Sequence, residues 1–241
     1  MTYSAPRKAK PRGAREARMP TVLLSLSGGA DSATLLARYL SSGYEAQGVF
    51  MDYGSKQNPL ELHAAKALAA HYGIPLHVHD LRGVFAGMPC AMMQGDARSI
   101  PQGAYDAASM SHTVVPGRNT IFAAILAGMA EAMRVEALAL AMHGGDHALY
   151  PDCRPEYAAA LARTIALSTE GGVRLETPFI AMSKADIIAM GLQLDVPYEL
   201  TRSCYTAETL ACGQCGTCVE RRRAFCANNA QDPLPYAPQP A

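Results

Sequence analysis

The residues best suited to chemistry stand in one short run, Ser27-Gly28-Gly29-Ala30-Asp31-Ser32, between an apolar stretch and a helical pattern. Two adjacent glycines let the backbone pass close to a ligand without a side-chain penalty. The serine hydroxyls and the N–H groups of a helix start then form a concavity that favours a phosphate-like anion. Asp31 suits such a site as a ligand for a magnesium ion that accompanies the phosphates. An ordinary strand-to-helix turn with serine caps is the alternative.

This run lacks the lysine of the GxxxxGK[ST] loop and does not match GxGxxG. It resembles the SGGxDS pyrophosphate loop of the N-type ATP pyrophosphatases. That resemblance implies cleavage of ATP between its α- and β-phosphates, transfer of AMP to a substrate, and a loop that holds the departing pyrophosphate. ATP, with its Mg²⁺, is then expected to contact Leu26, Ser27, Gly28, Gly29, Ala30, Asp31, Ser32, Ala33, Thr34, Leu35 and Leu36.

Two later segments, VPGRN and YPDCRPE, carry charged side chains that suit a polar substrate. Arg118 at a helix start opposes the helix dipole, which is tolerable if an anion lies beside it. A solvent-facing arginine in a turn is the alternative. Asp152 and Arg154 put both charge signs at a strand–helix junction, where a salt-bridged helix cap is the alternative. Cys153 has no histidine placed beside it by the sequence, so we interpret it as a small residue lining the site.

Four of the seven cysteines are crowded near the end of the chain, in a Cys-x7-Cys-x2-Cys-x2-Cys pattern. They are Cys204, Cys212, Cys215 and Cys218. Gly213 and Gly216 allow turns in which backbone N–H groups face thiolates. Four thiolates around one ion predict a structural zinc site, with a redox pair or an iron–sulfur cluster as alternatives. Three arginines at 221–223 follow on a predicted helix and are expected to neutralise the anionic site.

The elements that must position these residues follow from the hydrophobic pattern. Apolar runs that alternate with helical spacing predict an α/β fold with a parallel five-stranded sheet. Ligands gather at the carboxyl ends of parallel strands, so Asp31, Asp52 and the later motifs are expected at one edge. The first expected strand ends at about Leu26. The other four span residues 44–52, 74–80, 136–143 and 173–177. The expected helices span 31–41, 56–73 and 119–134, and a further helix begins at Pro155. A short helix follows a Ser183/Asp186 capping box, and its Lys184 could contact either phosphate or solvent.

Residues 81–112 lose this periodicity and are punctuated by glycine and proline. A long irregular segment inside a compact domain is usually a lid or a binding loop. We therefore expect this excursion to lie beside the site.

Length and composition fit one folded domain with a small appendage. The chain has 241 residues, 49% of them hydrophobic, and 21 basic against 21 acidic residues, which argues against a stable nucleic-acid complex. We expect a disordered basic leader over 1–19, an ATP pyrophosphatase-like α/β domain over 20–200, a four-cysteine zinc-binding tail over 201–228 and a loose C-terminus over 229–241. No apolar run approaches a membrane span or a signal-peptide core, so we expect no membrane partner and a reducing cytoplasmic location.

Taken in order, the loop, VPGRN, YPDCRPE and the four cysteines resemble the 7-cyano-7-deazaguanine synthases of queuosine biosynthesis over about residues 22–225. The resemblance implies a Rossmann-like sheet of the adenine nucleotide α-hydrolase type, a structural zinc, a homodimer, and the substrates 7-carboxy-7-deazaguanine, ATP and ammonia. On this basis Asp31 and Arg118 are the candidate catalytic residues, with Arg118 toward phosphate. Asp152 and Arg154 are the candidate contacts to the deazapurine.

One segment departs from this family. Its members commonly follow the second strand with Tyr-Gly-Gln-Arg-His, whereas this chain reads Tyr53-Gly54-Ser55-Lys56-Gln57. A lysine keeps a positive charge but lacks the bidentate fork of arginine. Two alternatives stay open: a related enzyme that stops at the amide or activates another carboxylate, and a nonenzymatic nucleotide-binding or RNA-associated zinc module.

The cysteines also bear on the source of nitrogen. Enzymes that draw nitrogen from glutamine use a cysteine nucleophile, placed at the mature N-terminus or in a glycine-flanked elbow. Neither Cys90 nor Cys153 has such a setting, and one sheet and one cysteine tail use the whole length of the chain. We therefore expect free ammonia to be the nitrogen donor.

Overall fold

The computed structural model describes residues 19–88, 90–103, 111–146 and 150–238. Its centre is a five-stranded parallel sheet with the order β3-β2-β1-β4-β5. This confirms the predicted α/β fold. The strands are β1 (Thr21–Ser25), β2 (Glu45–Asp52), β3 (Leu76–Asp80), β4 (Ala137–Ala139) and β5 (Arg174–Glu176).

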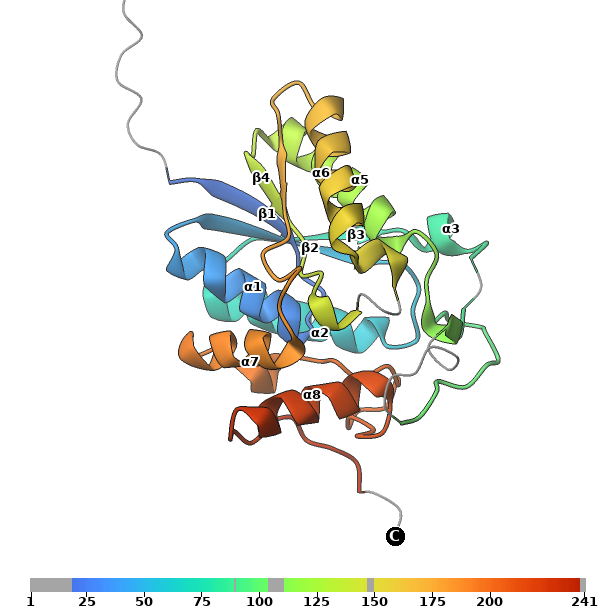
Figure 1. Ribbon diagram of the computed structural model, residues 1–241. Coiled ribbons are helices and arrows are strands. Elements are labelled where there is room, and N and C mark those ends of the chain that lie inside the picture. The colour runs from blue at the N-terminus through green and yellow to red at the C-terminus, as the bar shows by residue number, and fades with distance from the viewer. Residues whose placement is uncertain (1–18, 89, 104–110, 147–149, 239–241) are drawn as a thin grey trace, which may run out of the picture.

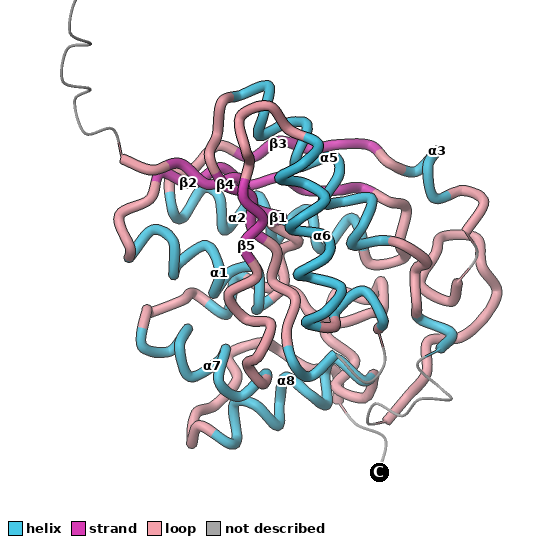
Figure 2. Tube along the Cα trace, turned by 45° about the horizontal axis from the view of Figure 1, so that its top comes forward, coloured by secondary structure: helices cyan, strands magenta, loops and turns pink. Residues whose placement is uncertain are grey.

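Helices cover both faces of this sheet (Figures 1 and 2). Helices α1, α2, α7 and α8 pack on one face, and α5 and α6 pack on the other. Such two-sided cover is what a parallel sheet needs, because both faces of its strands are apolar. The helices are α1 (Ala30–Ser41), α2 (Asn58–Tyr72), α3 (Arg82–Phe85), α5 (Arg118–Met133), α6 (Pro155–Ser168), α7 (Lys184–Gln193) and α8 (Gly216–Ala227).

The central strand β1 shows how the two layers of core are divided. Leu24 packs in the cluster on the α1 face, whereas Leu23 packs in the cluster on the α5 face. Both side chains are fully buried, and each contributes about 1.5–3 kcal/mol by leaving water. Phe225 of α8 belongs to the same cluster as Leu24, so the helix that follows the cysteines packs on the main core.

Strand β4 is shorter than the sequence predicts. The expected strand covered 136–143, but pairing with β1 and β5 involves only Ala137–Ala139. Residues 140–143 lie beyond this pairing and line a cavity, and Leu140 and Met142 among them also pack in the core on the α5 face. The apolar run therefore predicts the position of the strand but overestimates its length.

The irregular excursion is fixed at several points to the rest of the protein. Its described part contains α3 and a 3₁₀ turn at Ser111–Thr113. Cys90 and Met92 are buried in the core on the α5 face. Its role as a lid or binding loop stays a prediction, and residues 104–110 lie outside the described part.

The structure describes most of the C-terminal segment but almost none of the N-terminal segment. Of the predicted basic leader, residues 1–18 lie outside the described part, as do residues 239–241 of the expected loose C-terminus. Residues 229–238 make defined contacts: Leu234 is buried, and the Ala237 N–H donates to the Ala211 carbonyl at 2.8 Å. Within the described ranges, no helix has the length and apolar character needed to cross a membrane.

Candidate active site

A cavity opens at the carboxyl ends of the central strands, where the alternating pattern predicts ligand binding. The turn after β1, Tyr53 after β2 and residues 140–143 after β4 all contribute to its wall. Helix α5 supplies Arg118, and α8 supplies Glu220 from the opposite side. The cavity therefore collects residues from the first helix to the last.

The glycine turn after β1 has the shape of an anion-binding loop. Gly28 has φ +82°, and a Cβ there would meet the Glu61 carbonyl oxygen and, at 2.9 Å, the Ala64 Cβ. Only glycine fits this position, for reasons of both backbone angle and space. The Ser27 and Ser32 hydroxyls lie 3.1 Å apart, so the loop presents hydroxyls beside the N-terminus of α1.

Asp31 lies at the floor of the cavity in a network of charged groups. Lys184 Nζ donates to its Oδ2 at 2.5 Å, and His143 Nε2 lies 3.7 Å from the same oxygen. Burial acts to raise the pKa of Asp31, but the charges of Lys184 and His143 outweigh it and hold that pKa below its ordinary value. Asp31 Oδ1 is buried and has no hydrogen-bond partner among the described residues. One carboxylate oxygen is thus left for a cation or donor group.

Lys184, which the sequence assigns to phosphate or to solvent, is a buried residue of this cavity. It is the first residue of α7, which begins at the predicted Ser183/Asp186 capping box. Its ammonium also lies 3.8 Å from the Glu220 carboxylate. A buried lysine between two carboxylates and next to an anion loop can bind phosphate oxygens.

The other end of the cavity is built around Arg118. This residue begins α5 after Gly117, whose φ is +66°. The guanidinium carbon lies 5.9 Å from the centroid of the Tyr53 ring. Burial raises the pKa of Glu61, on the same wall, to about 7, against the opposing charges of Arg118 and Arg202 and a hydrogen bond from Gln57.

The structure places the predicted ATP-contacting residues in two groups. Those lining the cavity are Ser27, Gly29, Asp31 and Ser32. Leu26, Ala30, Ala33, Leu35 and Leu36 have side chains in the hydrophobic core, and Thr34 bonds the Tyr198 hydroxyl at 2.8 Å. Gly28 belongs to neither group, and ATP contacts of all these residues stay a prediction, which for the second group concerns the backbone.

The YPDCRPE segment contributes to the cavity through Cys153. Asp152 accepts a hydrogen bond from the Asn119 N–H at 3.2 Å and so caps α5. Arg154 is exposed and stands at the N-cap of α6. Neither Asp152 nor Arg154 lines the cavity, and their contact with a deazapurine stays a prediction.

Several lining residues were not identified from the sequence. Glu61 and Glu220 lie on helices at positions that a single sequence assigns to a solvated face. Arg202 follows no motif, yet its N–H donates to the Gly28 carbonyl at 2.8 Å and ties its segment to the anion loop. His143 ends a predicted strand, and no sequence motif predicts that its Nε2 lies 3.7 Å from Asp31 Oδ2.

The departure after β2 affects the scaffold of the site. Ser55 and Gln57 are buried, with exposed fractions of 0% and 1%. The Lys56 ammonium donates to the Arg98 carbonyl at 2.9 Å, on the excursion rather than in the cavity. The changed residues therefore help to anchor the excursion beside the site.

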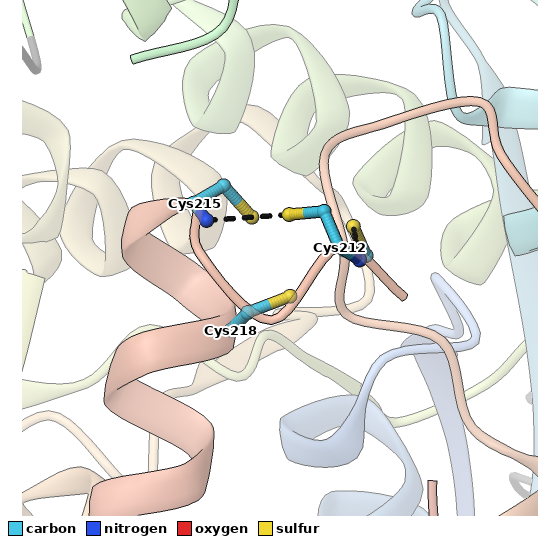
Figure 3. A group of neighbouring side chains, drawn as sticks. Cys212, Cys215 and Cys218 are labelled. Atoms are coloured by element: carbon cyan, nitrogen blue, oxygen red, sulfur yellow. Dashed lines mark hydrogen bonds between the residues drawn. The ribbon is translucent and has the colours of Figure 1, made fainter. Parts of the chain in front are cut away.

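The four C-terminal cysteines form one cluster that can hold a metal ion. Their sulfurs all lie within 4.8 Å of one another. An ion with four sulfurs about 2.3 Å away sets the sulfurs about 3.8 Å apart, so a small contraction suffices. The Cys215 N–H donates to the Cys212 sulfur at 3.3 Å, and Figure 3 shows how these side chains converge. Gly213, with φ +70°, provides the predicted turn.

The arginines after the cluster differ from the expectation. Arg221 is fully buried and binds Asp232, its Nε lying 2.8 Å from the carboxylate, instead of neutralising thiolates. It also donates to the Thr201 hydroxyl at 2.6 Å and to the Tyr198 carbonyl at 3.1 Å. The sequence does not reveal that Arg221 is a buried structural residue, because three consecutive arginines on a helix point in different directions and look alike in the sequence.

A family model described as queuosine biosynthesis protein QueC matches residues 21–229. This chain belongs to that family. The match includes the anion loop, Arg118, Lys184 and all four clustered cysteines.

Individual QueC relatives match over nearly their whole length. The 7-cyano-7-deazaguanine synthase of Paracoccus denitrificans is 42% identical over 220 residues, covering 90% of this chain and 93% of the relative. That of Caldicellulosiruptor saccharolyticus is 39% identical over 211 residues, covering 88% and 93%. Among solved structures, an NMN synthetase from Francisella tularensis aligns with a TM-score of 0.49 and 15% identity, covering 87% of this chain and 77% of that one.

Proposed function

We propose that this protein converts 7-carboxy-7-deazaguanine and ammonia to 7-cyano-7-deazaguanine at the expense of ATP. The product follows from the name of relatives that are 42% identical over 90% of the chain. The observation that carries an ATP-dependent reaction is the Ser27–Ser32 loop, which opens into the cavity beside the Asp31–Lys184 pair.

The chemistry explains the need for ATP. A carboxylate is a poor electrophile because its leaving group is oxide. Transfer of AMP gives a mixed anhydride with a good leaving group, and ammonia attacks it to give the amide. A second AMP transfer, to the amide oxygen, followed by loss of AMP and protons, gives the nitrile. The protein's part is to position the reactants and to stabilise phosphate charge.

The cavity supplies groups for each part of this reaction. The N–H groups and hydroxyls of the Ser27–Ser32 loop hold the pyrophosphate, and Lys184 adds positive charge beside it. Asp31 fixes Lys184 and offers its second oxygen to the magnesium that travels with ATP. Arg118, at the other end, neutralises the phosphate that stays on the substrate, or the substrate carboxylate itself. Asp152 and Arg154, which flank the cavity residue Cys153 in the sequence, are assigned to the deazapurine.

The cysteine cluster is assigned to one structural zinc ion. Four thiolates close a tetrahedral site and leave no position for a substrate. Backbone N–H groups donate to the sulfurs of Cys204 and Cys212, which suits thiolates bound to a cation. The ion would hold the segment before α8 in place, and with it the α8 side of the cavity.

The remaining assignments follow from the family resemblance. We assign the protein to the cytoplasm, as a homodimer that uses free ammonia. Light scattering of the purified protein measures the oligomeric state, and a monomer at micromolar concentration would contradict the dimer.

The test of function is mass spectrometry of the products formed from 7-carboxy-7-deazaguanine, ATP and ammonium. The expected result is the nitrile, with two AMP released for each nitrile formed. An amide as the final product would identify an enzyme that stops half-way. Absence of carboxylate-dependent pyrophosphate release would overturn the proposed activity, and release with a different carboxylate would reassign the substrate.

A further inference from the structure

Glu61 is a cavity carboxylate that the pyrophosphate and metal assignments do not use. It lies in the first turn of α2 and lines the wall that also carries Arg118 and Tyr53. Its backbone is fixed, since its N–H donates to the Gln57 carbonyl at 3.0 Å and its own carbonyl packs against Gly28. The backbone that carries the side chain is therefore held at a set position relative to the anion loop.

The three carboxylates that line the cavity have different partners. Asp31 and Glu220 both lie near Lys184 Nζ, at 2.5 and 3.8 Å. Glu61 forms no ion pair among the described residues. Of the three, Glu61 is thus the one without an ion-pair partner, although the charges of Arg118 and Arg202 act on it.

The surroundings of Glu61 suit a small cation with several N–H donors. The Gln57 side chain hydrogen-bonds to the carboxylate, while its Oε1 is buried and has no partner among the described residues. The cavity carboxylate thus neighbours an unmatched amide oxygen of Gln57, a residue just outside the cavity lining, and the ammonium ion carries four donors. The charged and titratable groups that face Glu61 are Arg118, Arg202 and Tyr53.

A proton acceptor is needed at this place in the reaction. Ammonium is the main form of ammonia near neutral pH, and it has no lone pair with which to attack a carbonyl carbon. Burial raises the pKa of Glu61 to about 7, so the group exchanges protons readily near neutrality. The positive end of α2 and the two arginines keep the ionised form accessible.

We propose that Glu61, with Gln57 beside it, binds ammonium in the cavity and accepts its proton. This rests on the proposed function. An N–H bond of ammonium breaks and its proton passes to the Glu61 carboxylate. The lone pair of the resulting ammonia forms the C–N bond at the adenylated carboxyl carbon. The C–O bond to AMP breaks with its electron pair on AMP, and the remaining excess proton on nitrogen passes to water.

The decisive variant is Glu61→Gln, which keeps the shape and hydrogen-bonding capacity of the side chain. Three reactions are measured with it: ammonium-dependent product formation, carboxylate-dependent ATP–pyrophosphate exchange, and hydroxamate formation with hydroxylamine. Hydroxylamine is neutral at pH 7 and needs no proton acceptor before it attacks. Ammonium-dependent turnover is expected to fall by roughly 10²-fold or more. Exchange and hydroxamate formation are expected to stay at the wild-type level.

The pH profile gives a readout that a purely structural role would not move. In Glu61→Gln the residual rate should rise with pH in proportion to free ammonia, whereas the wild-type rate should level off at lower pH. His63→Gln, at an exposed position of the same helix, is the matched control and should behave as wild type.

Two results would overturn the assignment of Glu61. One is an unchanged rate with ammonium, and the other is a parallel loss of exchange and hydroxamate formation, which would place Glu61 in adenylation or folding. Failure of the wild-type protein to exchange pyrophosphate would instead reject the proposed function, and the ammonium site with it.

Discussion

Replacing Glu61 by glutamine is expected to change how the stability of the protein depends on pH. Burial raises the pKa of Glu61 in the folded state to about 7, from an ordinary value of 4.5. Between these two values the folded state keeps a proton that the unfolded state loses, so the wild-type free energy of unfolding falls as pH rises. Each pH unit in that interval corresponds to about 1.4 kcal/mol, so the total loss is about 3 kcal/mol.

Urea denaturation of wild type and Glu61→Gln at a series of pH values measures this effect. The free energy of unfolding of the variant, minus that of wild type, should increase by about 3 kcal/mol from about pH 4.5 to about pH 7 and then stay constant. Other titrating groups cancel in the difference. Glu45→Gln, at an exposed position of β2, is the control and should give a flat difference. A flat difference for Glu61→Gln would refute the burial argument.

Three further predictions concern the rest of the site. Asp31→Asn should lower product formation by about 10²-fold or more in a folded protein, because Lys184 loses its partner and a magnesium ligand is removed; normal turnover in a steady-state assay would contradict this. Purified protein should contain about one zinc per chain by elemental analysis, and Cys215→Ser should lower both zinc content and melting temperature; iron with sulfide would reject the assignment. Glutamine in ammonia-free buffer should support no turnover, because Cys90 is buried and neither Cys90 nor Cys153 stands in a glycine-flanked elbow; product formed from glutamine alone would contradict the use of free ammonia.

The fold was predictable from sequence because each strand and helix has its own hydrophobic period. The order of elements and the site at the carboxyl edge of the sheet follow from that alternation. The length of β4 did not, since Leu140, Ala141 and Met142 are apolar but lie beyond the strand, in the wall of the cavity. An apolar run predicts that its residues are buried, but it does not show whether they pair with a neighbouring strand or line a cavity.

The charged residues of the site show a second limit. Lys184 and Arg221 are buried, and Glu61 is half-buried, at positions that helical spacing alone assigns to either solvent or core. Their partners are remote in sequence: Lys184 binds Asp31, 153 positions away. Such pairs depend on the packing of whole helices, which local sequence does not specify. The glycine loop was predictable because its chemistry is contained in six consecutive residues.

Helix α8 comes after the other described helices in order of synthesis, yet it supplies Thr217 and Glu220 to the cavity. The fifth strand is complete at Glu176, so a nascent chain can close its sheet long before the cavity has its last wall. Arg221 must then find Asp232, close to the C-terminus, to hold α8 against the Tyr198 carbonyl. A prematurely terminated chain that ends between these points would expose the apolar surface that α8 covers.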